Sequence, residues 1–475
     1  MKLSELAEET GELCGGDAEI RGLCTDSRVA GKGDLFFCFR GTREDGHKFA
    51  AEAAARGAAA VVCERKLALS CPQLVVSDGR EAMARIAAAF YGHPERRLKT
   101  VGVTGTNGKT TTATMIAEIL SAAGMRTGLV GTLGARYGTV VVPPSLTTPD
   151  PVCLFSLLAD MVAAGMEAVV LEVSAHALAL RKETPIRYDI AVFTNLTRDH
   201  LDFFGDMQAY GDAKKLLFQP NRCKFAVLNA DDGFSARLVG QGMPHMTYGL
   251  ETPADAFAVI ESESLCATRA VLNLEDELCE AVIPFTGRHN LLNALAAACA
   301  AKWLGADAEA IARGLECAHV EGRLEWVAKY RGGDIFVDFA HTPDGLEKSL
   351  GALREYCGGR LIALFGCGGN RDAGKRAKMG EVAARCADFC VLTSDNPRYE
   401  DPVAIISEIE AGFRPVSKRY VVVEEREKAI RYALEHLAEG DILLVAGKGA
   451  EKYQEIMGIK YDYDDKAVIK SLIGK

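Results

Sequence analysis

The segment Thr104-Gly105-Thr106-Asn107-Gly108-Lys109-Thr110-Thr111-Thr112 lies between the apolar run 101–103 and a predicted helix over 113–123. Its two glycines allow the backbone to turn N–H groups towards an anion, and the N-terminus of the following helix adds partial positive charge. Lys109 can then reach the terminal phosphates of a nucleotide, while Thr110 can offer its hydroxyl to Mg²⁺. The glycines are closer together than in the usual phosphate-binding loop. The strand, the Gly-Lys-Thr step and the helix nevertheless predict such a loop.

The composition indicates a globular protein of several domains. The chain has 475 residues, of which 48% are hydrophobic and 25% charged, and this length exceeds what one core usually organises. Its net charge of −10 disfavours nucleic acid and anionic membranes as partners, so local basic groups must hold any anionic ligand. The sequence shows no secretory signal and no apolar run of membrane-spanning length. The 15 cysteines include no Cys-x-x-Cys pair, which favours reduced thiols and a cytoplasmic location.

Apolar runs at 101–103, 168–173, 190–194 and 225–228 alternate with helical stretches. This pattern predicts a mostly parallel sheet covered on both faces, with the chemistry at the carboxyl ends of its strands. Two such ends carry candidate Mg²⁺ ligands. Glu172 offers the hard oxygen that Mg²⁺ prefers, whereas His200 could as easily be a structural histidine. From pattern alone, Lys214 is a surface lysine on a helix.

The flanking regions carry further candidate binding residues. Residues 1–98 form a small α/β unit without an evident catalytic cluster, and Ser27 there lies in a polar Asp-Ser-Arg segment that is either a turn or a binding loop. Asn290 and Asn293 share one helical face. Asn290 can read a purine edge or cap the helix N-terminus.

A second strand-helix series begins near Glu321. The apolar runs are 335–339, 361–365, 389–393, 420–423 and 442–445. Four of them end in polar loops, which predicts a binding edge on a Rossmann-like domain that lacks a Gly-x-Gly-x-x-Gly loop. The predicted fold is therefore α/β with three domains, covering residues 1–98, 99–321 and 322–475.

These motifs together resemble the Mur ligase family, and most closely its UDP-N-acetylmuramoyl-tripeptide synthetases of the meso-diaminopimelate-adding type. The resemblance covers nearly the whole chain and is carried by segments 104–112, 147–150, 172–174, 195–202 and 340–344. It implies an N-terminal domain that holds the uridine nucleotide, a central ATPase domain and a C-terminal domain that brings the amino acid.

The resemblance also implies the reaction. ATP would phosphorylate the terminal carboxylate of UDP-MurNAc-L-Ala-D-Glu, and an incoming amine would attack the acyl phosphate to give an amide, ADP and phosphate. Positioning and charge neutralisation supply most of the catalysis in such a transfer. The implied cofactors are Mg²⁺, ATP as co-substrate, and a CO₂-derived carbamate on Lys214. The implied protein is a cytoplasmic monomer of peptidoglycan synthesis.

The family pattern assigns roles to individual residues of this chain. The catalytic set is Lys109, Glu172, His200 and Lys214. The ATP-binding set is Gly105, Thr106, Asn107, Gly108, Lys109, Thr110, Thr111, Asn290, Arg323 and Asp338. The metal set is Thr110, Glu172, His200 and Lys214, the last as N6-carboxylysine. The UDP-muramoyl-peptide set is Ser27, Thr147, Thr148, Ser174 and Lys182. The diaminopimelate set is Arg371, Asp395, Asn396, Pro397, Arg398, Gly447 and Glu451.

The choice of amino acid depends on the segment Asp395-Asn396-Pro397-Arg398, which resembles the motif of diaminopimelate-adding enzymes. Arg398 and Arg371 can hold the distal carboxylate of this substrate through forked hydrogen bonds. L-lysine lacks that carboxylate and would leave both guanidinium groups unpaired. A ligase that adds L-lysine or another diamine is the first alternative, folylpolyglutamate synthase is a remote one, and a regulatory protein that has lost catalysis is an alternative of another class.

The sequence departs from the family pattern at four positions. These positions are Ala175, Leu180, Asn370 and Ala450. None of them is a proposed metal ligand or phosphate-binding group. We expect any effect to fall on affinity or on the tolerance for different amino acids.

Overall fold

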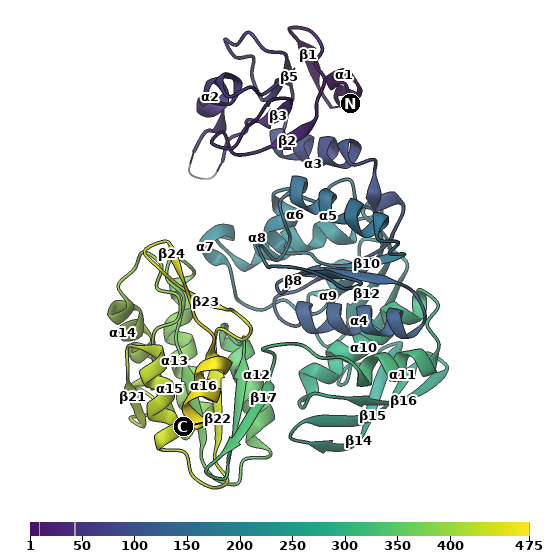
Figure 1. The fold of residues 1–475 in the computed structure, drawn as a ribbon. Coiled ribbons are helices and arrows are strands. Elements are labelled where there is room, and N and C mark those ends of the chain that lie inside the picture. The colour runs from purple at the N-terminus through teal and green to yellow at the C-terminus, as the bar shows by residue number, and fades with distance from the viewer. Residues whose placement is uncertain (9, 42–43, 475) are drawn as a thin grey trace.

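The computed structural model describes residues 1–8, 10–41 and 44–474, which form three α/β units along the chain (Figure 1). The first has a five-stranded sheet in the order β1-β5-β4-β3-β2. Its strands are β1 (Glu12–Cys14), β2 (Gly22–Cys24), β3 (Asp34–Phe37), β4 (Ala60–Cys63) and β5 (Gln73–Val75). Its helices are α1 (Leu3–Ala7), α2 (Ala50–Ala55) and α3 (Gly79–Phe90), with short 3₁₀ turns η1 (Gly46–Phe49) and η2 (Pro94–Arg96).

The central unit contains an 11-stranded sheet whose middle is parallel, in the order β13-β12-β11-β6-β10-β7, as predicted. Further strands extend it at both edges through antiparallel pairs, except that the strand next to β13 is parallel to β13. The parallel strands are β6 (Lys99–Thr104), β7 (Thr127–Gly131), β10 (Ala168–Glu172), β11 (Tyr188–Phe193), β12 (Cys223–Asn229) and β13 (His245–Tyr248). The edge strands are β8 (Gly134–Tyr137), β9 (Val140–Val142), β14 (Ala256–Ser264), β15 (Ala267–Leu274) and β16 (Glu277–Ile283).

Helices cover both faces of this sheet, which is why its middle strands are apolar throughout. On β10, Val170 packs in one core with α4 and α10, while Val169 and Leu171 pack in the other with α5. The helices are α4 (Lys109–Ala122), α5 (Pro151–Ala163), α6 (Ala175–Ala179), α7 (Leu201–Phe204), α8 (Met207–Lys215), α9 (Ser235–Val239), α10 (Arg288–Trp303) and α11 (Ala308–Glu316), with η3 (Leu216–Phe218).

The C-terminal unit has a six-stranded sheet in the order β17-β18-β22-β19-β20-β21, parallel except for β17. Its strands are β17 (Glu325–Tyr330), β18 (Gly333–Asp338), β19 (Leu361–Phe365), β20 (Phe389–Leu392), β21 (Tyr420–Val422) and β22 (Ile442–Ala446), followed by the hairpin β23 (Tyr453–Ile456) and β24 (Ile459–Asp462). Its helices are α12 (Pro343–Arg354), α13 (Arg376–Cys386), α14 (Pro402–Phe413), α15 (Arg426–Glu435) and α16 (Asp465–Ile473), with η4 (Ala373–Lys375).

The carboxyl ends of the central and C-terminal sheets face each other. Asn107, in the loop after β6, donates to Asp344 Oδ2 at 2.8 Å, and Arg323 reaches Thr110 Oγ1 at 3.0 Å. Polar loops from both sheets therefore meet at one place, as is usual for binding sites in α/β proteins. All 15 cysteines are free thiols. Within the described ranges, no helix is long and apolar enough to cross a membrane.

Candidate active site

The predicted phosphate-binding loop connects β6 to α4. The helix begins at Lys109, earlier than the predicted residue 113, and Gly108 precedes it with a φ of 85°. Asn107 O accepts hydrogen bonds from Thr194 Oγ1 at 2.6 Å and from Asn195 Nδ2 at 3.1 Å. The residues that follow β11 therefore fix the position of the loop. The N–H groups of the first turn of α4 face the cleft between the central and C-terminal units.

We expect Gly105→Ala to weaken both nucleotide binding and the fold. Gly105 has a φ of 154°, and an added Cβ would overlap Thr194 Oγ1 and crowd Asn195 N. Strain of this kind costs about 1–3 kcal/mol, which urea unfolding would measure, and a displaced loop would raise the KM for ATP roughly tenfold. Gly124→Ala is the matched control, because Gly124 also has a positive φ but has no atom within 4 Å of its added Cβ. Equal effects from both variants would contradict the prediction.

Two lysines converge on one carbonyl of this loop. Lys109 Nζ donates to Gly105 O at 2.9 Å and to Thr106 O at 2.8 Å, and Lys214 Nζ donates to Gly105 O at 2.8 Å. Lys214 is only 1% exposed, so the pattern-based expectation of a surface lysine is wrong. The α8 helix places the Lys214 side chain beneath the phosphate-binding loop. Burial, and then the neighbouring Lys109 charge, hold the pKa of Lys214 well below its usual value.

Glu172 ends β10 and is held by two threonines. Its Oε2 accepts from Thr110 Oγ1 at 2.9 Å and from Thr132 Oγ1 at 3.0 Å, while Oε1 accepts from Thr132 N at 2.8 Å. His200 lines the same cleft as Glu172. Burial lowers the pKa of His200 to about 3. A neutral imidazole and a carboxylate can both offer lone pairs to a cation. Among residues 1–8, 10–41 and 44–474, no group of three or more His, Cys, Asp or Glu side chains is arranged so that it could hold a metal ion.

Asp199 connects the central and C-terminal units, a role that the sequence did not reveal. Its carboxylate lies 3.3 Å from Lys375 Nζ, 3.6 Å from His341 Nε2 and 3.4 Å from His200 Nε2. Burial raises the pKa of Asp199, but a hydrogen bond from His341 and the charge of Lys375 together hold this pKa below the usual range. Its position directly before His200 was an available signal. Lys375 and Thr132 carried no comparable signal, because their partners are distant in sequence.

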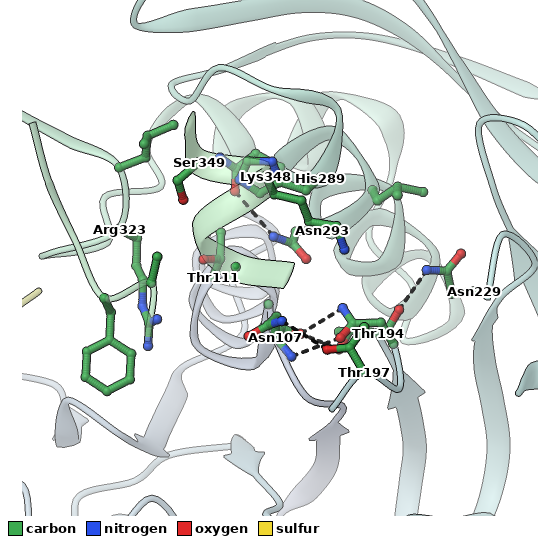
Figure 2. Close-up of a pocket in the computed structure, with 18 of the residues that line it drawn as sticks. Asn107, Thr111, Thr194, Thr197, Asn229, His289, Asn293, Arg323, Lys348 and Ser349 are labelled. Carbon is green, nitrogen blue, oxygen red and sulfur yellow. Dashed lines mark hydrogen bonds between the residues drawn. The ribbon is translucent and has the colours of Figure 1, made fainter. Parts of the chain in front are cut away.

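A first cleft of about 210 Å³ lies beside the phosphate loop (Figure 2). Figure 2 shows Arg323 at its left and Asn229 at its right. Asn290 lies on α10, where its Nδ2 donates to Thr286 O at 2.9 Å and its Oδ1 accepts from Asn293 Nδ2 at 3.3 Å. The capping alternative for Asn290 is wrong, because Gly287 occupies the N-cap position.

Arg323 and Asp338 enter this cleft from the C-terminal unit. The Arg323 guanidinium lies 4.3 Å from the Phe339 ring centroid, a cation–π arrangement that fixes its direction. Asp338 accepts from Leu324 N at 2.7 Å and from Ala340 N at 2.6 Å. Asp338 therefore fixes the backbone directly after Arg323 and the loop that follows β18.

A second cleft of about 310 Å³ lies on the other side of the phosphate loop. Lys109, Thr110, Glu172 and His200 line it from the central unit. From the C-terminal unit it is lined by Arg371, Asp395, Asn396, Arg398, Gly447 and Glu451. The structure thus brings three of the four predicted metal residues and part of the predicted phosphate loop to the same cleft as six of the seven predicted amino-acid residues, whereas Lys214 does not line this cleft.

The arginine loop has a defined internal geometry. Arg398 has a φ of 54°, and its guanidinium donates to Gly369 O at 2.8 Å and to Glu455 Oε2 at 3.1 Å. Arg371 is exposed, and among the described residues its guanidinium hydrogen-bonds only to a backbone carbonyl, Asn370 O, at 3.4 Å. Pro397, the seventh predicted residue, accepts a hydrogen bond from Glu400 N at 3.0 Å through its carbonyl.

The predicted muramoyl-peptide residues divide between cleft and framework. Thr147 lines the second cleft. Thr148 points inward, where its Oγ1 donates to Glu172 O at 2.7 Å and accepts from Ser174 N at 3.0 Å. Lys182 pairs with Asp150 at 2.7 Å. Ser27 lies in the N-terminal unit, outside both clefts, and donates to Glu52 Oε2 at 2.9 Å.

Comparison with known proteins gives the family. Residues 19–91 match the Mur ligase family catalytic domain, residues 103–301 the Mur ligase middle domain, and residues 322–449 the Mur ligase glutamate ligase domain. A UDP-N-acetylmuramoyl-L-alanyl-D-glutamate–2,6-diaminopimelate ligase of Geobacillus kaustophilus is 43% identical, over 97% of this chain and 96% of its own. This chain belongs to the Mur ligase family.

Other members support the same placement. The enzyme of the same name from Chlorobaculum tepidum is 42% identical, over 99% of this chain and 97% of its own. A solved structure of such a ligase superposes with a TM-score of 0.68 at 33% identity, covering 96% of this chain and 95% of its own. The MurF ligase of Thermotoga maritima, solved with ADP, shares the fold with a TM-score of 0.65 at 22% identity, covering 95% of this chain and 97% of its own. The predicted resemblance and the three-domain α/β fold are confirmed.

Proposed function

We propose that this Mur ligase joins meso-diaminopimelate to UDP-N-acetylmuramoyl-L-alanyl-D-glutamate at the cost of ATP. The second cleft is the observation that carries the proposal. It places Lys109 and Glu172 of the central domain opposite Arg371 and Arg398 of the C-terminal domain. A phosphorylated carboxylate and an incoming amine must meet in one place, and this cleft supplies groups for both.

ATP fits across the boundary between the two clefts. The adenine end would occupy the first cleft beside Asn290, with Arg323 and Asp338 contributed by the C-terminal domain. The phosphates would lie over the loop from Gly105 to Thr111, where N–H groups and Lys109 offset their charge. Lys109 would give up its bonds to the loop carbonyls and donate to phosphate oxygens instead.

The donor groups beside this loop fit Mg²⁺. Thr110, Glu172, His200 and a modified Lys214 would hold it, and an incomplete protein cage suits a cation that keeps waters and binds substrate phosphates. When bound, the ion supplies charge neutralisation at the phosphoryl group. Thr132 would fix the direction of the Glu172 carboxylate.

Lys214 is suited to carbamylation. Its amine is buried, and its depressed pKa favours the neutral form that attacks CO₂. The N–C bond forms, one amine proton leaves, and the product is an N6-carboxylate that carries a negative charge. This anion would offset the positive charge of Lys109, whose Nζ bonds the same Gly105 carbonyl.

In the reaction, the D-Glu carboxylate attacks the γ-phosphorus and ADP leaves. The amine of the amino acid then attacks the acyl carbon, phosphate leaves, and one amine proton is lost. Thr147, which lies in the second cleft, would contact the muramoyl peptide. Ser27, in the N-terminal domain, would contact the uridine end. Thr148 and Ser174 would contribute to peptide binding by fixing the end of β10. Lys182 would contribute through its ion pair with Asp150.

Selection of the amino acid would depend on the arginine loop. Arg371 and Arg398 would hold the distal carboxylate, and Glu451 with Gly447 would receive the adjacent ammonium. Asp395, Asn396 and Pro397 shape this loop.

The organisation of the protein completes the proposal. We place the domain boundaries near residues 98 and 321, supported by the start of β6 at Lys99 and of β17 at Glu325. We further infer a cytoplasmic monomer that acts on free nucleotide-linked substrates, without nucleic acid.

The test is phosphate release from ATP by purified protein with Mg²⁺ and UDP-MurNAc-L-Ala-D-Glu, comparing meso-diaminopimelate, L-lysine and L-ornithine. We expect turnover with meso-diaminopimelate alone, with the amide product confirmed by mass. Turnover mainly with L-lysine would contradict the role given to the arginines. No turnover with any amine would favour a regulatory protein.

A further inference from the structure

Lys448 lies behind the second cleft, and no step described above uses it. Its side chain is 0% exposed, which is rare for lysine. Nζ donates to Tyr453 O at 2.7 Å, to Asn396 Oδ1 at 3.0 Å and to Glu451 Oε2 at 3.5 Å. Asp395 Oδ1 lies 3.7 Å from the same nitrogen. One buried ammonium therefore contacts three residues of the amino-acid site.

The contact with Asn396 determines which end of its amide faces Glu451. Asn396 Oδ1 accepts from Lys448 Nζ and from Glu455 N at 2.9 Å, and Nδ2 donates to Glu451 Oε2 at 2.9 Å. The reversed amide would place its NH₂ group against two donors. Lys448 thus keeps a donor directed at the Glu451 carboxylate.

The same ammonium also lies beside two carboxylates that face the cleft, Asp395 and Glu451. The like charges of these carboxylates repel each other. Lys448 offsets one of these charges from behind. Glu451 Oε2 is occupied by Asn396 and Lys448, whereas Oε1 has no hydrogen-bond partner within the described part of the chain. Oε1 is therefore available to accept from an ammonium group in the cleft.

We propose that Lys448 is a positioning residue that sets the direction of Asn396 and of the Glu451 carboxylate for the ammonium of the incoming amino acid. This inference rests on the proposed function, since it concerns the amine substrate of that reaction. Lys448 does not line the cleft, so it acts through its neighbours and leaves the nucleotide site unchanged.

The test measures the three KM values of Lys448→Met, with the other two substrates saturating. We expect the KM for meso-diaminopimelate to rise about 30-fold, because a charge-assisted hydrogen bond is lost. The KM values for ATP and for the UDP-muramoyl dipeptide should stay within about twofold of wild type. Similar rises in all three KM values, or a fall in kcat alone, would overturn the inference.

Lys302→Met is the control, since Lys302 has the same kinds of partner, a carbonyl, Leu274 O at 2.7 Å, and a carboxylate, Glu277 at 3.0 Å, although its side chain is only partly buried. It lies in the central domain away from both clefts, so its KM values should be unchanged. Adding Lys448→Met to Asn396→Ala should change the KM by less than about threefold, because the two act as a unit. Full additivity would contradict positioning through Asn396.

If Lys448→Met does not fold, Asn396→Asp is the second variant that tests the inference. The new carboxylate keeps an acceptor for Lys448, but it places a negative charge beside Glu451 and removes the donor to it, so the KM for meso-diaminopimelate should again rise. An unchanged KM would overturn the inference. An inactive wild-type enzyme would overturn the proposed function and this inference together, whereas an active wild type with unaltered variants would overturn the inference alone.

Discussion

Lys214→Ala is expected to reduce ligation by at least roughly a thousandfold, a loss typical when a charged group at a phosphoryl-transfer site is removed. The native side chain is buried under the phosphate loop and contacts Gly105 O at 2.8 Å. Alanine leaves a space in its place and removes the carbamate that would offset Lys109. Phosphate release under saturating substrates measures the loss.

Acetate should restore part of the activity of this variant. A small carboxylate can enter the space left by the lysine stem and supply the missing negative charge, giving a recovery of about tenfold. Chloride at the same ionic strength should give none. Lys215→Ala, on the neighbouring and less buried residue of α8, should retain full activity. Near-normal turnover of Lys214→Ala without additives would contradict the carbamate.

The strand series was predictable because buried parallel strands are apolar on both faces. Each central strand predicted from such a run is present, with bounds within a few residues. The start of α4 was placed too late, because Thr110, Thr111 and Thr112 do not look helical by propensity. In the fold these three threonines are buried in the first turns of α4, so tertiary contacts override their weak preference.

The burial of Lys214 could not be predicted from the sequence pattern of its helix. The α8 helix is short and polar, so a lysine near its end looks solvent-exposed by pattern. Its burial depends on the phosphate loop passing over it, a contact across 109 residues of chain. The family resemblance assigns Lys214 to the proposed site, a placement that periodicity did not suggest.

The hydrogen bonds and ion pairs between domains could not be predicted from local sequence patterns either. Asp199 meets Lys375 across 176 residues, and no periodicity encodes such a contact. Thr132 follows β7 in a turn with no motif of its own, yet it supplies two of the hydrogen bonds that fix Glu172. Motifs thus pointed to the proposed reacting groups, while the groups that orient them appeared only in the fold.

Glu172→Gln is expected to lower kcat by about a hundredfold to a thousandfold, the range for losing one preorganised electrostatic group. The amide keeps the size of the carboxylate. Its oxygen could still accept from Thr132 N, and the hydroxyls of Thr110 and Thr132 can rotate to accept from its NH₂ group. The fold should therefore persist, and the loss should reflect charge.

This interpretation also predicts a dependence on metal concentration. If the Glu172 carboxylate holds Mg²⁺, the variant should need roughly tenfold more Mg²⁺ for half-maximal activity, as expected when a single charged ligand is lost from a weak site. Glu167→Gln changes the residue just before β10, where Glu167 pairs with Arg126 at the surface, and it should leave both values unchanged. A Glu172→Gln enzyme with a normal Mg²⁺ requirement would show that the carboxylate acts only by holding Thr110 and Thr132, because a group that binds the cation cannot lose its charge without weakening that binding.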